Sequence, residues 1–328
     1  MHAERLLDSP IISAARHSGI GVNIQGPSLI RVPEWIPAPL GRYYLYFADH
    51  KGAYIRLAFA DELVGPWEIY GLGSLQLEES FFPTEPPSVP EGAREAMAQR
   101  YREAGIDPDK LPHDPMVDMT TPHIASPDVR VDPEHQRVIM YYHGLESFGN
   151  QRSRVAVSKD GIHFQALIPL VARPYMRTFE YGGYTYALAM PGHFYRAQGS
   201  LTEFEEGPVL FNKNMRHNAV LVRGDELFVF WTQVGDAPER ILLSRIDLTR
   251  PWLDWSASDP VEVLRGEREW EGANEPVEPS RRSVAYGRVN QLRDPAIFVE
   301  EGRTYLLYAV AGESGIGIAE LCFDGPCQ

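Results

Sequence analysis

The sequence predicts an all-β fold in which five strand–turn–strand repeats are arranged radially or as a solenoid. In the last repeat, the charged pair Arg293-Asp294 precedes a short apolar strand, and a second strand rich in Tyr and Leu follows the turn at Gly302. Four upstream segments repeat this pattern, with first strands that begin near residues 27, 127, 177 and 217. Degenerate repeats of such a unit are typical of β-propellers and β-solenoids. The 28 glycines and 27 prolines supply the turns that many short strands need.

Composition favours one large domain. The chain has 328 residues, of which 44% are hydrophobic, so it can bury a sizeable core. We expect a single domain over residues 1–328, with insertions at about 76–122 and 267–289. The net charge of −14 argues against a nucleic-acid backbone or an anionic membrane as a partner. The sequence contains no apolar run of about 18 residues, as a membrane span would need.

Compartment and cysteine chemistry are linked. The first seven residues lack the apolar core of a secretory signal, which predicts a cytoplasmic protein, although a secreted protein whose signal has been removed gives the same pattern. Cys322 and Cys327 form either a small terminal disulfide or two free thiols. The cytoplasmic assignment favours free thiols. The sequence does not indicate the oligomeric state.

The two ends of the chain are expected to meet. A short strand is predicted at Ser9–Ser13 and has no partner nearby in the sequence. The last repeat, in turn, has no room for a fourth strand after Leu321. We therefore expect the N-terminal strand to complete the last sheet and close the ring, because closure removes an exposed sheet edge.

Further strands follow from apolar alternation and from turn residues. In the first repeat the third strand is expected at 54–60 and the fourth at 67–70. The third strands of the next three repeats are expected at 154–158, 193–196 and 240–245. Two of the four spacings between first strands match the roughly 40–50 residues of a four-stranded blade. The two longer spacings contain the insertions.

The first insertion includes a predicted helix at 91–104, where Ala, Glu, Arg and Met dominate after Pro90. Gly105 and Pro108 end it. Long insertions are often functional. This one either covers a site on one face of the ring or serves as a structural clasp.

Four motifs connect these repeats to a known family. A Tyr-rich second strand lies at Tyr43–Phe47, and Leu63–Trp67 follows an Ala-rich third strand. Ser126–Val129 opens the second repeat, and His217-Asn218 opens the fourth. With these motifs the chain resembles the five-bladed β-propeller glycoside hydrolases, namely the arabinanase and β-xylosidase group and their neoagarobiose-hydrolase relatives. The resemblance covers nearly the whole chain outside the two insertions, and it implies a five-bladed β-propeller and a carbohydrate substrate.

The resemblance also implies three carboxylates, one at the start of each of the first three inner strands: a base, an Asp that orients and tunes, and a Glu acid. Asp128 matches the second position. Gly26 stands where the base is expected, and Tyr175 begins the segment where the acid is expected. Glu206 has the expected Gly-Pro after it but lies at the end of the third repeat, so it is expected on the surface. The acid/base pair is therefore predicted to be rearranged.

Asp294 is the best candidate for the base, because it begins an inner strand beside Arg293, whose charge would keep it ionised. The alternative is that this pair joins the last blade to the first. Asp128 either shares the role of Asp294 or caps a turn. The acid is expected among His217, His50, His123 and Glu313.

The resemblance places the histidine of the fourth blade at the central axis beside a bound Ca²⁺, so His217 is also the predicted metal-side residue. Tyr175, Tyr181 and Trp35 are candidates for sugar stacking. The predicted catalytic residues are Asp128, Asp294, His217 and Glu313. The predicted substrate-binding residues are Gln25, His50, His123, His143, Tyr175, Arg177, Asn218 and Arg293.

Arg177 is an unexpected cation on an inner strand. With Arg293 it indicates an anionic or heavily hydroxylated ligand, such as a uronic acid or a sulfated sugar, because Arg binds carboxylates bidentately. Alternatively, Arg177 pairs with Asp128 or Glu180. The favoured function is an inverting glycoside hydrolase that acts on a terminal sugar of an oligo- or polysaccharide. A non-catalytic carbohydrate-binding propeller, or a lyase or phosphorylase on the same scaffold, is the alternative.

Overall fold

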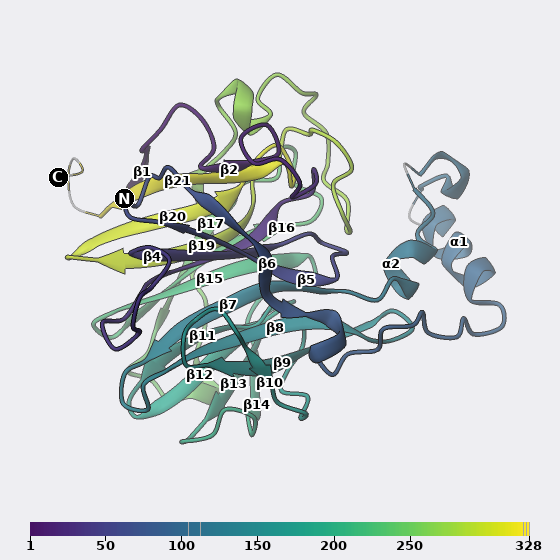
Figure 1. The fold of residues 1–328 in the computed structure, drawn as a ribbon. Helices are drawn as coiled ribbons and strands as arrows, with labels where there is room; N and C mark the ends of the chain where they lie inside the picture. Colours follow the sequence, from purple (N-terminus) through teal and green to yellow (C-terminus); the bar gives the residue numbers. More distant parts are fainter. Residues whose placement is uncertain (104, 112, 324, 326, 328) are drawn as a thin grey trace.

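The computed structural model is an all-β propeller with five blades (Figure 1). It describes residues 1–328 except 104, 112, 324, 326 and 328. Each blade is an antiparallel sheet, and the first strand of each sequence repeat lies innermost, next to the inner strands of neighbouring blades. The predicted five-bladed fold is confirmed.

Four blades are continuous in the sequence. Blade 1 contains β3 (Gln25–Arg31), β4 (Tyr43–Ala48), β5 (Tyr54–Ala60) and β6 (Glu68–Gln76). Blade 2 contains β7 (Ile124–Asp132), β8 (Arg137–Ser147), β9 (Asn150–Ser158) and β10 (Gln165–Ala166). Blade 3 contains β11 (Arg177–Tyr181), β12 (Tyr184–Ala189), β13 (His193–Ala197) and β14 (Glu205–Val209). Blade 4 contains β15 (Met215–Arg223), β16 (Glu226–Gln233), β17 (Ile241–Asp247) and β18 (Val261–Leu264).

Blade 5 is built from both ends of the chain. Its C-terminal strands are β19 (Arg293–Glu300), β20 (Arg303–Ala309) and β21 (Gly315–Cys322). Two N-terminal strands, β1 (His2–Arg5) and β2 (Ile12–Ser13), pair antiparallel with β21. The expected closure by the N-terminal segment is confirmed, and β1 is an addition that the sequence did not predict.

A buried ion pair fastens this closure, and a disulfide lies close to it in the C-terminal segment. The guanidinium of Arg5 donates to Glu271 from Nε and Nη2, both at 2.8 Å, and Glu271 is fully buried. Cys322 and Cys327 form a disulfide, so the expectation of free thiols is wrong. The ring is therefore closed by strand pairing and by a buried ion pair, and the disulfide ties the end of β21 to the segment that follows it.

The core lies between the blades, and β4 shows how the sequence builds it. Tyr44 and Tyr46 pack toward blade 2, where Tyr46 donates a hydrogen bond to the carbonyl of Gly161 at 2.6 Å. The alternate residues Leu45 and Phe47 pack toward blade 5. Successive side chains of a strand point to opposite faces, so a strand buried on both faces has an almost continuous apolar sequence.

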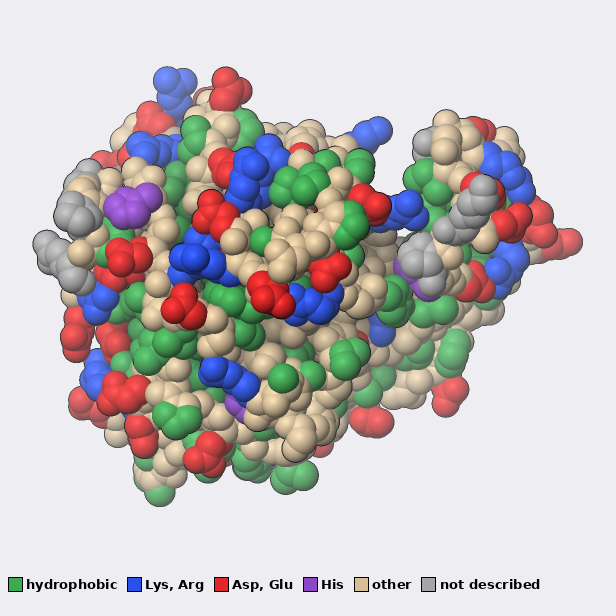
Figure 2. Space-filling view, turned by 90° about the horizontal axis from the view of Figure 1, so that it is seen from above, with side chains coloured by type: hydrophobic (Ala, Val, Ile, Leu, Met, Phe, Trp, Pro, Cys, Tyr) green, Lys and Arg blue, Asp and Glu red, His purple; other side chains and the backbone are tan. Residues whose placement is uncertain are grey.

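The first insertion contains α1 (Ala93–Glu103) and α2 (Met116–Thr120). The helix predicted at 91–104 is present, and its expected last residue, Ala104, lies outside the described residues. The insertion projects from the blades and forms a separate lobe beside the body of the molecule (Figure 1, Figure 2). None of the described helices is long and apolar enough to cross a membrane.

Candidate functional site at the propeller axis

The start of every inner strand carries one residue with a left-handed backbone. The φ angle is 63° at Gly26, 51° at Ser126, 58° at Tyr175, 43° at His217 and 48° at Asp294. In blades 1, 2, 4 and 5 the strand register shifts across this residue, which marks a β-bulge. Bulges re-aim side chains, and non-glycine residues in this conformation cluster at functional sites. These five residues, called the bulge ring below, mark the end of the axis where a site is expected.

Asp294 is the carboxylate of the bulge ring, and it is 1% exposed. Its Oδ1 accepts a hydrogen bond from the hydroxyl of Tyr175 at 2.8 Å and lies 3.6 Å from Nε2 of His217. Its Oδ2 has no hydrogen-bond partner among the described residues. Burial and the negative charge of Glu313 raise the pKa of Asp294 to about 6. The side chain can therefore hold a proton close to neutral pH.

Glu313, on the loop between β20 and β21, is a second buried carboxylate. It accepts hydrogen bonds from Arg293 and Asn23, both at 2.6 Å, and Nδ1 of His50 lies 3.2 Å from each of its oxygens. Burial alone would raise the pKa of Glu313, but His50 and Arg293 hold it well below its usual range. Asp294 and Glu313 thus have pKa values displaced in opposite directions, as is typical of acid/base sites.

Arg293 contacts other groups than its sequence neighbour Asp294. Its guanidinium donates to Glu313 and, from Nε at 3.0 Å, to Oε1 of Gln291, and it lies 3.5 Å from Glu239. The charge of Arg293 does lower the pKa of Asp294, as expected, but burial and the negative charge of Glu313 outweigh it, so the pKa of Asp294 is raised overall.

Glu239 is a buried anion that the sequence analysis missed. Arg216 donates to both of its oxygens, from Nε at 2.9 Å and from Nη2 at 2.5 Å. Together with Arg293 and Glu313, this pair forms an alternating chain of buried positive and negative groups. Its sequence signal is weak, since Glu239 stands alone between Pro238 and Arg240 without a motif.

Four rings lie next to one another at the level of the bulge ring. The ring centroids are 6.0 Å apart for His123 and His143, 6.4 Å for His143 and Tyr175, and 5.0 Å for Tyr175 and His217. Burial and nearby cations lower the pKa of all three imidazoles, to about 3 for His143. Nε2 of His123 and Nδ1 of His143 have no partner among the described residues. Neutral imidazoles of this kind can bind the hydroxyl groups of a ligand.

A cavity of about 370 Å³ lies at this end of the axis. His217 and Arg216, at the start of blade 4, line it together with His50 and Lys51 from the loop between β4 and β5. Three residues of the first insertion, Tyr101, Asp118 and Met119, also line the cavity. The insertion therefore covers one side of the cavity and is more than a structural clasp.

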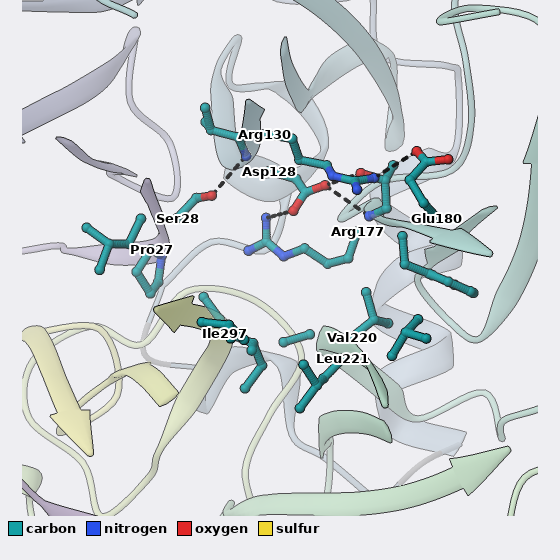
Figure 3. A pocket seen from close by; sticks show the side chains of 17 residues that line it. Pro27, Ser28, Asp128, Arg130, Arg177, Glu180, Val220, Leu221 and Ile297 are labelled. Carbon is teal, nitrogen blue, oxygen red and sulfur yellow. Dashed lines mark hydrogen bonds and ion pairs between the residues drawn. The ribbon is translucent and has the colours of Figure 1, made fainter. Parts of the chain in front are cut away.

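A second cavity of about 350 Å³ is lined by residues that lie further along the inner strands than the bulge ring, toward the other end of the axis (Figure 3). Asp128, two residues beyond Ser126, lines this second cavity. Its Oδ2 accepts hydrogen bonds from the backbone N–H and the hydroxyl of Thr178, at 2.9 and 2.7 Å, and its Oδ1 lies 3.9 Å from Arg177. Asp128 therefore joins blades 2 and 3 and does not line the cavity next to His217.

Arg177 is buried and lines the second cavity. Its guanidinium lies over the Tyr175 ring, 4.7 Å from the centroid, and donates to the carbonyls of Asn218 and Pro127. Its Nη2 has no partner in the described part of the chain. The predicted pairing with Asp128 is present.

The remaining predicted residues divide between the axis and the periphery. Gln25 is buried and accepts a hydrogen bond from the Ser126 hydroxyl at 3.1 Å, and Asn218 donates to the Tyr175 carbonyl at 3.2 Å. Glu206 lies exposed on β14, as expected for a surface residue. Two stacking candidates lie away from the bulge ring: Trp35 is on the loop that follows β3, and Tyr181 ends β11.

The donor atoms at the axis form a poor calcium site. Ca²⁺ takes six to eight oxygen ligands. His217 instead lies close to the charges of Arg216, Arg293 and Arg177, which lower its pKa along with burial. Among the described residues, one cluster of His, Cys, Asp and Glu side chains is close enough to hold an ion. It lies where the two ends of the chain meet, away from the axis, and consists of His2, Glu4, Cys322 and Cys327. Calcium at the centre stays a prediction, and no chemical step below depends on it.

Solved structures with the same architecture are five-bladed glycoside hydrolases. A thermostable family-43 glycoside hydrolase superposes with a TM-score of 0.55 at 13% identity, over 94% of this chain and 93% of that one. The α-L-arabinanase of Cellvibrio cellulosa, in complex with arabinohexaose, gives 0.53 at 14% identity over 93% of both chains. A β-xylosidase/α-arabinofuranosidase from a compost metagenome, in complex with xylotriose, gives 0.57 at 10% identity over 98% and 96%. The fold is thus that of the family-43 five-bladed propellers.

The sequence defines a narrower family. No family model matches the chain. It is 33% identical over 326 residues to Uncharacterized protein R118 of Acanthamoeba polyphaga mimivirus, an alignment that spans 92% of this chain and 84% of the viral protein. The chain therefore belongs to the same family as the viral protein.

Proposed function

We propose that this protein is a glycoside hydrolase that removes a terminal sugar from an oligo- or polysaccharide, with Asp294 as the proton donor. The observation that carries the proposal is the state of Asp294, a buried carboxyl with a free oxygen and a pKa of about 6, next to His217 of the cavity. Glycoside hydrolysis needs an acid that protonates the leaving oxygen. The shared propeller fold supports a carbohydrate substrate.

The reaction is a single displacement. The proton on Asp294 passes to the glycosidic oxygen while the bond from C1 to that oxygen breaks and a water molecule attacks C1 from the opposite face. Asp118 accepts the proton that the water loses. Its Oδ1 is free of hydrogen bonds from the described residues and lies 3.8 Å from Nζ of Lys51. Attack from the opposite face inverts the configuration at C1.

Other groups at the axis support the donor. The negative charge of Glu313 helps to keep the proton on Asp294, because ionisation would place two buried anions close together. Tyr175 and His217 hold the carboxyl from one side. The neutral imidazole of His217, which lines the cavity, is available to sugar hydroxyls, with the buried rings of Tyr175, His143 and His123 packed in series behind it.

The test is activity on a panel of chromogenic and natural oligosaccharides, uronates and sulfated sugars included. General acid catalysis contributes about 10²–10⁴-fold, so Asp294→Asn should lower kcat/KM by that factor, and Asp118→Asn should do the same. Asp128→Asn is the matched control, because this carboxylate lines the other cavity. We expect Asp128→Asn to lower stability. Its kcat/KM should stay within about tenfold of the value for the intact protein, well short of the losses in the other two variants. Proton NMR of the first product reports inversion.

Two results would contradict the proposal. If Asp294→Asn retained full activity while Asp128→Asn lost it, the chemistry would lie at the other end of the axis. If the intact protein turned over nothing in the panel, a carbohydrate-binding propeller would be the better description. Urea unfolding of each variant shows whether a loss of activity reflects a loss of fold.

A further inference from the structure

The cavity next to the bulge ring is cationic in a chain whose net charge is −14. Four lysine or arginine side chains line it, and among the described lining residues the one carboxylate is that of Asp118. The four cations come from blade 1, blade 3, blade 4 and the second insertion: Lys51, Arg173, Arg216 and Arg282. A concave site lined by one sign of charge concentrates ligands of the opposite sign.

Arg216 does not contribute to this excess, because its charge is neutralised by an ion pair with Glu239. Arg216 donates to both oxygens of Glu239, and the deeper Arg293 is neutralised by Glu239 and Glu313. The buried layer beneath the cavity is therefore close to electrical balance. The excess positive charge lies at the mouth.

Three cations at the mouth lack a close carboxylate partner. Nζ of Lys51 lies 3.4 Å from the carbonyl of Asp118 and 3.8 Å from its carboxylate, although the Lys51 side chain is only 11% exposed. Arg282 donates to the carbonyl of Lys213 at 2.9 Å. Neither Arg282 nor Arg173 forms an ion pair with any carboxylate that the structure describes. A nearly buried ammonium with such long contacts is poorly satisfied unless a ligand completes its hydrogen bonds.

The pKa values of the neighbouring histidines are lowered by the same positive charges. Beyond burial, Lys51 lowers the pKa of His123 and His143, and Arg216, Arg293 and Arg177 lower that of His217. An anion bound at the mouth would relieve this repulsion. The cavity, the long contact of Lys51 with Asp118, the lack of ion pairs at Arg173 and Arg282 among the described residues, and the lowered pKa values of the imidazoles all favour an anionic ligand.

We propose that the substrate is a sugar with an anionic substituent, held at the cavity mouth by Lys51, Arg173 and Arg282. The substituent is the carboxylate of a uronic acid or a phosphate or sulfate ester. This inference rests on the proposed function and names its substrate class. The sugar ring then lies against the neutral imidazole of His217 in the cavity wall, with its anomeric carbon toward Asp294 next to that imidazole.

Binding is measured by calorimetry on the intact chain, so that the result does not depend on turnover. The probes are D-glucuronate, D-galacturonate, glucose 6-phosphate and galactose 6-sulfate, each compared with neutral glucose or galactose. We expect at least one anionic probe to bind tenfold or more tightly than its neutral parent. The preference should fall in 0.5 M salt, because charge–charge attraction is screened. The comparison of carboxylate, phosphate and sulfate probes identifies the substituent.

Three variants test which side chains cause the preference for the anionic probe over its neutral parent, namely Lys51→Met, Arg173→Gln and Arg282→Gln. Each should reduce the preference for the anionic probe at least threefold while the neutral parent binds as before. Arg250→Gln, which removes the same charge at an exposed position outside the cavity, should leave the preference unchanged. Retention of the preference in all three mouth variants would overturn the assignment.

The outcomes for substrate class and for catalysis are separable. Hydrolysis of neutral glycosides with no preference for any anionic probe would overturn the inference and leave the hydrolase intact. Binding of an anionic probe without turnover of any glycoside would support the anionic ligand and overturn the hydrolase. Tight binding of inorganic phosphate alone, with neutral sugars bound only in its presence, would overturn the inference in favour of a phosphorylase.

Discussion

Asp294 and Glu313 show how two similar groups in one buried layer acquire opposite properties. Glu313 has Arg293, His50 and Asn23 around its oxygens, and these donors stabilise its negative charge. Asp294 has one hydroxyl donor, and it lies in the field of Glu313. The number of donors around each carboxyl therefore decides which of the two holds a proton near neutral pH.

The first prediction at the residue scale concerns the pH dependence of catalysis. If Asp294 donates the proton, kcat/KM should fall as pH rises through about 6, because the donor is lost above its pKa. The hydrogen bond from Tyr175 lowers the pKa of Asp294, so Tyr175→Phe should move this limb to higher pH. The measurement is a pH profile of kcat/KM for both proteins. A limb that stays in place, or that moves to lower pH in Tyr175→Phe, would exclude Asp294 as the titrating donor.

The sequence located these residues better than it assigned their roles. Asp294 was recognisable because a charged residue directly before an apolar inner strand recurs at corresponding positions. The surroundings of Asp294 could not be predicted in this way. Arg293 is its neighbour in the sequence but donates a hydrogen bond to Glu313, which lies 20 residues further along the chain. Lys51, Asp118 and Glu239 carry no motif. Their importance follows only from the loops that bring them to one end of the axis.

At the scale of elements, the strands were predictable and the closure was only partly so. Strands such as β4 and β5 have almost continuous apolar sequences, interrupted in β5 by Arg56, because both of their faces pack against neighbouring blades. β1 has the sequence His-Ala-Glu-Arg with alternating exposed and half-buried positions, so it lacks that signal. Only its pairing with β21 makes it a strand.

The ion pair behind β1 should matter for stability. Arg5→Ala would leave the fully buried Glu271 without its guanidinium, and breaking a buried ion pair costs about 3–5 kcal/mol. Arg31→Ala is the matched control, since the Arg31 side chain is 49% exposed where it contacts Glu300, and exposed pairs contribute about 0–1 kcal/mol. Urea unfolding measures both. Equal losses in the two variants would mean that the closure of the ring does not depend on this contact.

At the scale of the whole molecule, repetition made the fold predictable from a single sequence. Five similar units cannot bury their faces alone, so they must pack against one another, and the ring removes their edges. The charge distribution was not predictable in this way. The net charge of −14 describes the outer surface, where side chains of both signs are interspersed (Figure 2), whereas the axial cavity is lined by cations.

The buried imidazoles make the stability of the whole propeller depend on pH. His123, His143 and His217 have pKa values below the ordinary value, so the folded protein keeps them neutral while the unfolded chain binds protons below about pH 6.5. Their contribution to stability is therefore present above pH 6.5 and is lost as pH falls. Asp294 acts in the opposite direction, because its raised pKa lets the folded state bind a proton near pH 6.

Three histidines against one carboxyl should give a net loss of stability on acidification. Each proton bound only by the unfolded chain contributes about 1.4 kcal/mol per pH unit. Between pH 6 and 5 the free energy of unfolding should therefore fall, with the slope reduced by up to about 1.4 kcal/mol per pH unit in His143→Gln. His2→Gln, at an exposed position, should leave the slope unchanged. Urea unfolding at a series of pH values measures these slopes. A free energy of unfolding that rises toward pH 5 would mean that the imidazoles at the axis are charged in the folded protein, which would remove the neutral ring lining proposed for the sugar.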